Sequence, residues 1–476
     1  MPELPLRERR KAAILPGEQQ PWAPTEGMEL TFLPAALGPC PSYPINMPFK
    51  SNELFHYFYE LEDSVDIMPR EKRQDMLTSV TQSPDALRNT ILVAGLHYAW
   101  NVGHLQRFEP TLLFHKIESM RLVNGCIKQS RPKSYSVCIR QIATLCFTEC
   151  CLGNVATAET HLIGLVKFMD LHSPPDLDQE HTLSVDEELS NRYVILVYNF
   201  IYAFKSRLQD IMDDDDGLES GQRPTPAKVE AIMHAWHKEE TRGLEIRLKA
   251  MKMFPFFFAP LPPTAKFCDI DALPMLDCMI TLTETTRFRG QRSEDVRAKQ
   301  LVWFEGAATR LLLAFVGGHI ESLSRQDNGG LHRPRLKTSW CGMSTATGLY
   351  LHAVLGLWNA GQPIEPQLHR RVLTILKHDL NRSRSEAHSG SRLVSDLWFW
   401  KAFNGAFSLA KSGEDNSSQS VLEPMQRPFR QLIRGWSDRT GIKDWPKARK
   451  ALENIVWPGG FKQESVAETI WNRSIL

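Results

Sequence analysis

Paired cysteines are missing from this 476-residue chain, although it contains nine cysteines. A structural zinc site needs cysteines about two residues apart, in two pairs, so that four thiolates can surround one ion. No Cys-x-x-Cys occurs, and Cys146, Cys150 and Cys151 have the spacing of one helix face and its neighbour. We therefore predict no metal ligands among the cysteines, and we expect them to be small buried side chains in a reducing compartment.

An excess of either charge is missing as well. The 56 Lys and Arg residues nearly balance the 55 Asp and Glu residues, which leaves a formal net charge of +1. Such a chain has no overall positive field to attract nucleic acid. If it binds nucleic acid, a local patch or a separate module must supply the phosphate contacts.

Long apolar segments are also absent. The longest nearly uninterrupted ones, residues 194–204 and 311–316, are too short to cross a bilayer of about 30 Å. Residues 1–20 carry charges and prolines where a signal peptide needs an apolar core. We expect no transmembrane helix, no membrane partner and no secretion.

No catalytic motif is complete. Gly317-Gly318 and Gly329-Gly330 lack the lysine and the spacing of a phosphate-binding loop. The segment from Gly342 to Ala346 loosely resembles a nucleophile elbow around Ser344, but that motif needs a strand-to-helix turn and the context here is helical. We predict no catalytic residue and no cofactor site, and hence a chain that is not an enzyme.

One histidine pattern has the spacing of possible metal ligands. Glu230, His234 and His237 follow each other at steps of four and three residues, so all three could lie on one helix face. The next residues, 238–240, are all charged. This favours a solvated helix face, and we predict no metal site there.

Amphipathic helical periodicity runs through most of the chain, most clearly over residues 111–171. Apolar side chains recur at three- and four-residue steps up to Cys150 and again from Ala158. Between them, Gly153 suits the left-handed residue that ends a helix, and Asn154 can cap the helix that follows. So short a connection predicts two antiparallel helices, preceded by a third amphipathic segment from Leu113.

Further start and stop signals predict more helices. Pro84 follows Ser83 at a favoured first position, and Ser184 with Glu187 forms a capping box. The aromatic segment 254–260 is predicted to break the long helix 228–253 and to be packed. No stretch alternates as a β-sheet requires. The remaining expected helices start at Ser51 and cover residues 271–285, 295–322, 344–359, 366–383, 394–411 and 424–436.

These elements predict an all-α fold, a multi-helix globular bundle of antiparallel hairpins in two lobes. Residues 1–47 are expected to be a proline-rich extended tail, residues 48–208 the first lobe, and residues 227–476 the second. The intervening 209–226 contains four consecutive aspartates and is predicted to be a mobile acidic linker. The tail carries a basic cluster, Arg7, Arg9, Arg10 and Lys11, which could serve nuclear import or contact a DNA backbone. Because Glu8 interrupts it, we interpret it as a solvated terminus.

Several segments in the right order resemble one family. They are Pro44 to Pro48 with Leu54 to Phe58, then Phe114 to Ile117 with Leu152 to Leu165, and finally Leu452 to Pro458 with Ile470-Trp471. Together, from about residue 40 to the end, they resemble the fungal-specific transcription factor domain, the helical regulatory region that follows a zinc binuclear cluster in many fungal regulators.

This sequence departs from that family because the six-cysteine cluster and its basic linker are missing, and only Cys40 precedes Cys126. The resemblance implies a nuclear regulatory domain that binds protein partners or a small effector, forms homodimers or heterodimers, and associates with nucleic acid indirectly. A cytoplasmic location is the alternative. A second hypothesis is that an upstream exon encoding the cluster is missing, which transcript mapping upstream of Met1 would decide.

A third hypothesis, from another class, is a helical small-molecule-binding protein or enzyme. It would need titratable residues from distant segments that converge on a pocket. Two tryptophan-bearing segments, 394–411 and 436–471, could be partner surfaces, because aromatic side chains anchor interfaces. We favour packing of these tryptophans in the core.

Overall fold

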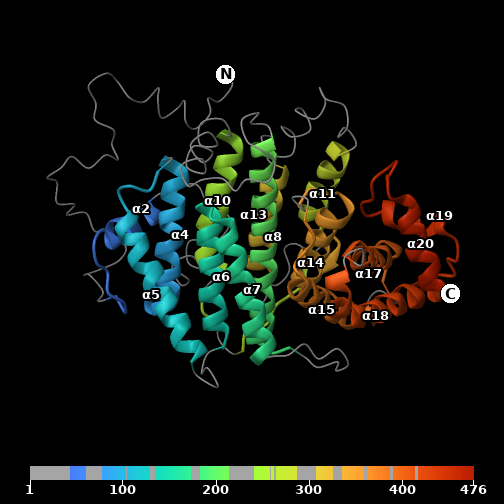
Figure 1. Cartoon of the computed structure of the whole chain (residues 1–476), viewed down its shortest axis with the longest axis horizontal. Helices are drawn as coiled ribbons and strands as arrows, with labels where there is room; N and C mark the ends of the chain where they lie inside the picture. Colours follow the sequence, from blue (N-terminus) through green and yellow to red (C-terminus); the bar gives the residue numbers. More distant parts are fainter. Residues whose placement is uncertain are drawn as a thin grey trace.

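The computed structural model describes residues 43–60, 78–102, 104–128, 135–172, 183–213, 241–257, 259–261, 264–286, 307–324, 335–358, 362–385, 390–412 and 416–476. Within these ranges the chain is almost entirely helical, which confirms the predicted all-α fold (Figure 1). The strands described are β1 (Ile270–Asp271) and β2 (Lys337–Thr338), which pair antiparallel.

The body is elongated (Figure 1). The first half contains α2 (Ser51–Glu60), α4 (Pro84–Val102), α5 (Glu109–Ile127), α6 (Tyr135–Cys151), α7 (Val155–His172) and α8 (Val185–Asp213). The second half contains α10 (Thr241–Phe257), α11 (Leu273–Thr286), α13 (Ala307–Ser324), α14 (Trp340–Leu349), the π-helical turn η3 (Tyr350–Val354), α15 (Pro366–Arg382), α17 (Arg392–Ser412), α18 (Asn416–Thr440), α19 (Trp445–Glu453) and α20 (Glu464–Ile475). α2, α4 and α5 lie near one end of the body and α18, α19 and α20 at the other, and α10 lies back beside α4 (Figure 1).

The predicted hairpin is confirmed in α6 and α7. Gly153 has a φ of +83°, and the backbone N–H groups of Gly153 and Asn154 donate to Cys150 and Glu149 at 3.0 and 2.8 Å. These two bonds end α6 in the Schellman arrangement. The side-chain amide of Asn154 donates to the Glu149 carboxylate at 2.9 Å, and the same carboxylate pairs with Lys116 of α5. A buried carboxylate thus joins the hairpin to the preceding helix.

The capping box at the start of α8 is also confirmed. The backbone N–H of Ser184 donates to Glu187 at 2.8 Å, and the N–H of Glu187 donates to the Ser184 hydroxyl at 3.3 Å. α8 continues to Asp213, so the helix includes residues 209–213, which were expected to begin the acidic linker. Residues 214–226 lie outside the described ranges, and the division into two lobes stays a prediction.

Three predicted helix boundaries differ from the structure. The segment 254–260 ends the helix as predicted, with Phe254 and Phe257 buried, but the helix continues into it as far as Phe257, with Pro255 inside its last turn. Pro255 cannot donate a backbone hydrogen bond within the helix. This loss is offset by the burial of Phe254 and Phe257 and by the stacking of Phe254 on Phe147 at 4.3 Å. α18 begins at Asn416 rather than Pro424, and α14 begins at Trp340 rather than Ser344. α19 and α20 were not predicted.

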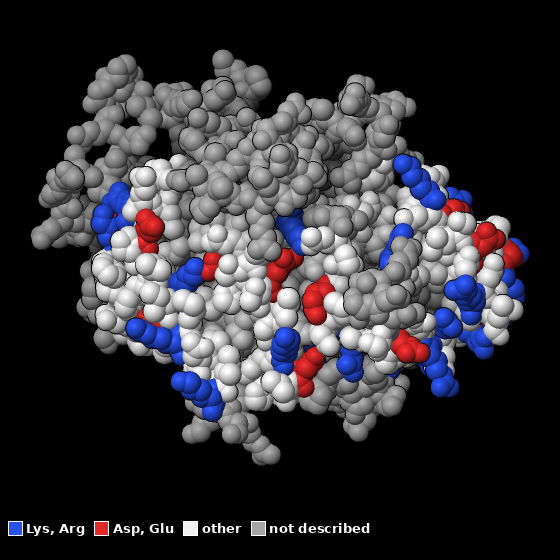
Figure 2. All heavy atoms as spheres, in the orientation of Figure 1, with Lys and Arg blue, Asp and Glu red and all other residues white. Residues whose placement is uncertain are grey.

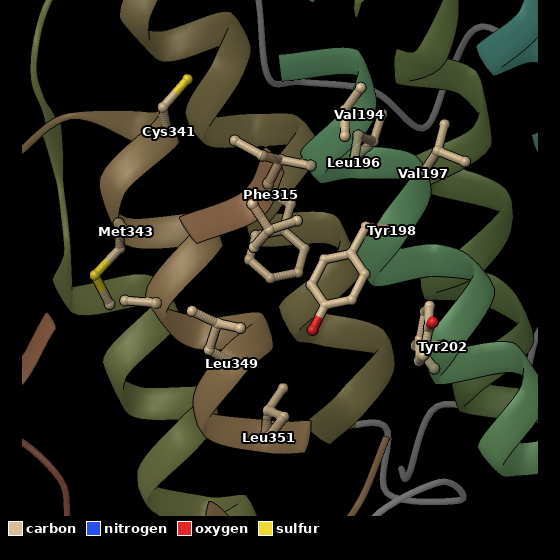
Figure 3. Packing of buried hydrophobic residues seen from close by; sticks show 14 of the residues in the cluster. Val194, Leu196, Val197, Tyr198, Tyr202, Phe315, Cys341, Met343, Leu349 and Leu351 are labelled. Atoms are coloured by element: carbon tan, nitrogen blue, oxygen red, sulfur yellow. The ribbon is translucent and has the colours of Figure 1, made fainter. Parts of the chain in front are cut away.

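Most of the buried apolar side chains described form one large cluster that includes helices from both predicted lobes, and Val80, Ala86 and Ala259 form a small second cluster. α8 lies near the centre of the large cluster and faces α13 and α14, with Tyr198, Phe315 and Leu349 among the packed residues (Figure 3). The backbones of α8 and α14 approach closely, since a Cβ at Gly348 would lie 2.5 Å from the Asn199 side chain. Helices before and after the acidic segment therefore share one interior.

The tryptophans of the C-terminal segments belong to this core. Trp398, Trp400, Trp436 and Trp471 are each no more than 3% exposed. The ring of Trp436 stacks on Phe399 at 3.9 Å, and Trp471 contacts Phe399 edge-on at 5.7 Å. The interpretation of these side chains as core residues is confirmed, and they are not available as surface anchors.

The close contact of α17 with α18 supplies a stability test. A Cβ at Gly405 would lie 2.2 Å from the Phe429 ring, whereas a Cβ at Gly164 in α7 would meet nothing within 4 Å. We expect Gly405→Ala to lower the free energy of unfolding by about 1–3 kcal/mol through overpacking. Gly164→Ala should raise it by about 0.5–1 kcal/mol, because alanine favours a helix over glycine. Urea unfolding midpoints compare the two variants, and equal midpoints would contradict the described contact.

Candidate functional site

A pocket of about 230 Å³ opens where β2, α14, α15 and α17 meet. Most of its lining residues are polar or charged, and three are apolar. The lining residues are Asp269, Lys337, Thr338, Ser339, Asp379, Arg382, Ser383, Val394, Leu397, Trp398 and Lys401. They come from segments separated by up to about a quarter of the chain, so the pocket is a product of tertiary packing.

The short β-ladder fixes one edge of the pocket. Ile270 is paired with Thr338, and the carboxylate of Asp271 accepts from the backbone N–H groups of Arg335 and Leu336 at 3.1 and 3.3 Å. Ser339 follows in an extended conformation and caps α14, with its hydroxyl accepting from the Gly342 N–H at 2.9 Å. The ladder and the cap together direct the N-terminus of α14 toward α15.

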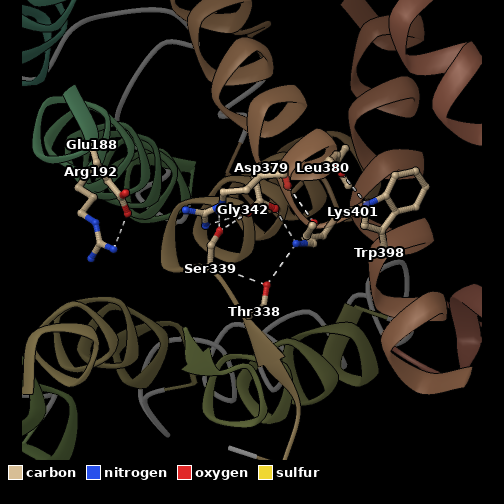
Figure 4. A network of polar contacts seen from close by, with 11 residues as sticks. Glu188, Arg192, Thr338, Ser339, Gly342, Asp379, Leu380, Trp398 and Lys401 are labelled. Atoms are coloured by element: carbon tan, nitrogen blue, oxygen red, sulfur yellow. Dashed lines mark hydrogen bonds and ion pairs between the residues drawn. The ribbon is translucent and has the colours of Figure 1, made fainter. Parts of the chain in front are cut away.

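A buried ion pair forms the floor of the pocket. The ammonium of Lys401 lies 2.6 Å from Oδ2 of Asp379, and their side chains are only 4% and 3% exposed. Lys401 also donates to the Thr338 hydroxyl at 3.2 Å, and the Ser339 hydroxyl donates to Oδ1 of Asp379 (Figure 4). Because a buried charge is costly unless it is paired, these contacts make the arrangement stable.

Asp379 lies directly against the first turn of α14. A Cβ at Gly342 would lie 1.8 Å from Oδ2 of Asp379, so only glycine leaves room for this carboxylate. The N-terminus of a helix carries a partial positive charge, which stabilises a nearby anion. Asp379 therefore interacts favourably with both Lys401 and the α14 dipole.

The pKa of Asp379 lies below its usual value near 3.8. Burial alone would raise this pKa, but the charge of Lys401 and the hydrogen bonds from Lys401 and Ser339 lower it by more. Asp379 is thus ionised at neutral pH and is a poor proton acceptor for the Ser339 hydroxyl. The arrangement is suited to binding rather than to acid–base chemistry.

The groups that remain for a ligand are mostly donors. Asp379 and Lys401 satisfy each other, the Ser383 hydroxyl donates to the Asp379 carbonyl at 2.8 Å, and the Trp398 indole N–H donates to Leu380 at 2.9 Å. Arg382 lies 3.8 Å from Asp379 with half of its side chain exposed, and Lys337 is exposed at the mouth. The lining holds three cations, Lys337, Arg382 and Lys401, and two carboxylates, Asp269 and Asp379, so it carries one positive charge in excess.

The residues considered in the sequence do not form this site. Ser344 is fully buried inside α14, where its backbone carbonyl accepts from Asn199 at 3.3 Å, so it is not on a nucleophile elbow. Cys146 and Cys150 are buried in α6, and desolvation raises the pKa of both thiols. Glu230, His234, His237 and the basic cluster at residues 7–11 lie outside the described residues.

Within the part of the chain that the structure describes, no group of three or more His, Cys, Asp or Glu side chains could hold a metal ion. Over the same residues, none of the helices combines the length and the hydropathy that crossing a membrane requires.

Sequence reasoning missed the ion pair. Its only signals are one lysine within the apolar segment around Trp398 to Phe403 and one aspartate on the apolar face of α15. From the sequence alone, the lysine and the aspartate could each be a solvated side chain, because nothing in the sequence shows that they contact each other.

The comparisons with known proteins add no assignment. No family model, no curated protein and no solved structure matches this chain. The family resemblance therefore stays a prediction, and any function has to be argued from the chain itself.

The ion pair predicts a strong non-additivity between two substitutions. Asp379→Asn leaves the Lys401 charge buried and unpaired, which should cost about 3–5 kcal/mol of unfolding free energy. Because apolar residues can replace a buried pair, Asp379→Leu combined with Lys401→Met should cost less than the two single changes added together. A double-mutant cycle in urea measures this, and additive effects would show that the two side chains are not coupled.

The same pair gives a pH dependence with a defined sign. The folded pKa of Asp379 is lower than its unfolded value, so its contribution to stability is present above about pH 3.8 and is lost as the pH falls through the folded pKa. Asp379→Asn should lack this acid-dependent loss in urea midpoints measured across that range.

Proposed function

We propose that this chain is a helical regulatory domain of a transcription regulator, and that the pocket between α14, α15 and α17 binds a small organic anion as its effector. The observation that carries the effector site is the surplus of cationic donors above the Lys401–Asp379 pair. The regulatory role rests on the resemblance of the sequence to fungal-specific transcription factor domains, and it includes a nuclear location and protein partners.

The size and the lining of the pocket restrict the ligand. A cavity of about 150 Å³ can hold benzene, and pockets for drug-sized molecules usually start at about 300 Å³. The volume of about 230 Å³ lies between these values. The lining combines the apolar side chains of Val394, Leu397 and Trp398 with the cations Arg382 and Lys337. This combination suits one carboxylate or similar anionic group on a small apolar or aromatic body.

α15 offers a physical connection between the pocket and the first half of the chain. One end of this helix carries Asp379 and Arg382, which line the pocket. About two turns earlier, Arg371 lies 3.6 Å from Asp170 of α7 and donates to Asn191 of α8 at 3.3 Å. A ligand that prefers one position of α15 would therefore also bias the contacts of α15 with α7 and α8.

The ligand class is testable with benzoate, compared with the neutral benzamide of the same shape. We expect benzoate to bind and benzamide to bind at least about tenfold more weakly, which is a difference of about 1.4 kcal/mol in titration calorimetry. Arg382→Gln and Lys337→Gln should each weaken benzoate binding, because they remove the donors at the mouth. Lys443→Gln is the matched control, since Lys443 is exposed and lies outside the pocket lining. Equal binding of benzamide would refute the anion preference, and unchanged binding in both pocket variants would refute the site.

The regulatory role has its own test. Chromatin immunoprecipitation of the tagged protein should enrich promoter fragments, and Val394→Trp, which narrows the pocket, should change expression of the nearby genes without lowering protein abundance. Exclusive residence in the cytosol with no promoter enrichment would count against the role. The alternative of a missing zinc-cluster exon predicts promoter enrichment only for the longer protein.

A further inference from the structure

The solvent side of α18 carries a row of arginines. Arg427, Arg430 and Arg434 are all exposed, and their spacing of three and four residues places them on one face of the helix. Figure 2 shows Lys and Arg gathered at the end of the molecule where α18, α19 and α20 lie in Figure 1. In a chain with a formal net charge of +1, this is a local concentration of positive charge.

Two more arginines converge beside this row. Arg384 follows two residues after the end of α15. Its Nη2 atom lies 3.3 Å from the position where a Cβ on Gly435 would be, so it is close to this turn of α18. Arg439 donates from its Nη2 to the carbonyl of Gly435 at 3.3 Å. Both guanidinium groups thus lie at the same turn of α18. Desolvation and the charge of Arg384 lower the pKa of Arg439, as expected for like charges held close together.

The arginines of this face are not held in ion pairs among the residues described. None of the five arginines forms an ion pair within those ranges, and Arg430 and Arg434 instead donate to Gln426 and to the carbonyl of Ser474, both at 3.2 Å. Asp438 lies on the same side of α18 and interacts electrostatically with Arg434, but it pairs with Lys443. Glu423 is the other acidic residue of this exposed side.

The chemistry of this face favours phosphate. All five cations are arginines, whose planar fork binds a phosphate through two parallel hydrogen bonds and is weakly hydrated. From Arg427 to Arg439 the helix rises about 18 Å, which is long enough for the face to meet more than one phosphate of the same strand. No large apolar side chain is exposed on the described part of α18, so neither a lipid surface nor an apolar protein anchor is favoured.

We propose that this α18 face, consisting of Arg427, Arg430, Arg434, Arg439 and Arg384, binds the phosphate backbone of nucleic acid without reading its sequence. The face lies outside the pocket lining and does not depend on the proposed effector. It supplies the local positive patch that a chain of nearly zero net charge needs for such binding.

The salt dependence of DNA binding tests this directly. The probe is a fluorescein-labelled duplex of about 20 base pairs with mixed sequence, titrated at salt concentrations from about 50 to 200 mM while anisotropy is recorded. Each neutralised phosphate adds about −0.9 to the slope of log K against log salt. Replacing Arg427, Arg430 and Arg434 by Gln together should therefore make the slope less negative by about 2–3 and weaken binding more than tenfold at low salt.

Two further variants make the result specific. The control variant combines Lys447→Gln, Lys450→Gln and Lys462→Gln. It removes the same number of positive charges, but from α19 and the following loop, and it should leave the slope of log K against log salt nearly unchanged. Replacing the three α18 arginines by Lys should keep the slope but reduce affinity, because the fork is lost. Circular dichroism and urea midpoints check that each variant is folded.

The proposal is overturned if the α18 variant keeps the wild-type slope, or if the α19 control loses as much binding as the α18 variant. It is also overturned if poly-glutamate competes as well as unlabelled DNA, since the face would then recognise acidic protein segments. Binding of the duplex that is lost only in the α18 variant supports it.

Discussion

An ionised carboxylate in a protein interior has to be paired, and this requirement determines how the second half of the chain is assembled. Asp379 of α15 is satisfied by Lys401 of α17 and by Ser339 at the start of α14. The absence of a side chain at Gly342 lets the carboxylate reach the helix end. α15 contributes the carboxylate, α17 the ammonium, and the start of α14 the hydroxyl and the space that the carboxylate occupies. The need to pair the buried Asp379 charge therefore restricts how these three helices are placed relative to one another.

The candidate site is a consequence of this restriction. The pocket opens directly above the ion pair, where Arg382, Lys337 and the apolar wall of α17 meet. Because Asp379 and Lys401 neutralise each other, they fix the shape of the floor but contribute little free charge. The specificity of the pocket therefore depends on the less buried residues at its mouth, which can change without unfolding the core.

Local signals in the sequence predicted local structure well, and contacts between distant segments could not be predicted. Gly153 with Asn154, and Ser184 with Glu187, act over a few residues, and the structure confirms the turn and the capping box that they predicted. Pro255 was interpreted as a helix break because its missing N–H favours one, but the burial of neighbouring phenylalanines outweighs that cost. The partner of Lys401 lies 22 residues away on another helix, so no spacing rule could identify it. The α18 arginines are visible in the sequence, but their common face with Arg384 depends on how α15 ends.

The shared interior has a consequence for the acidic segment between the halves. α8 ends at Asp213 and α10 begins at Thr241, and both helices belong to one packed body. Because the side chains of both helices pack in one core, the parts of the chain before and after this segment are held together by buried apolar contacts and not only by the covalent connection.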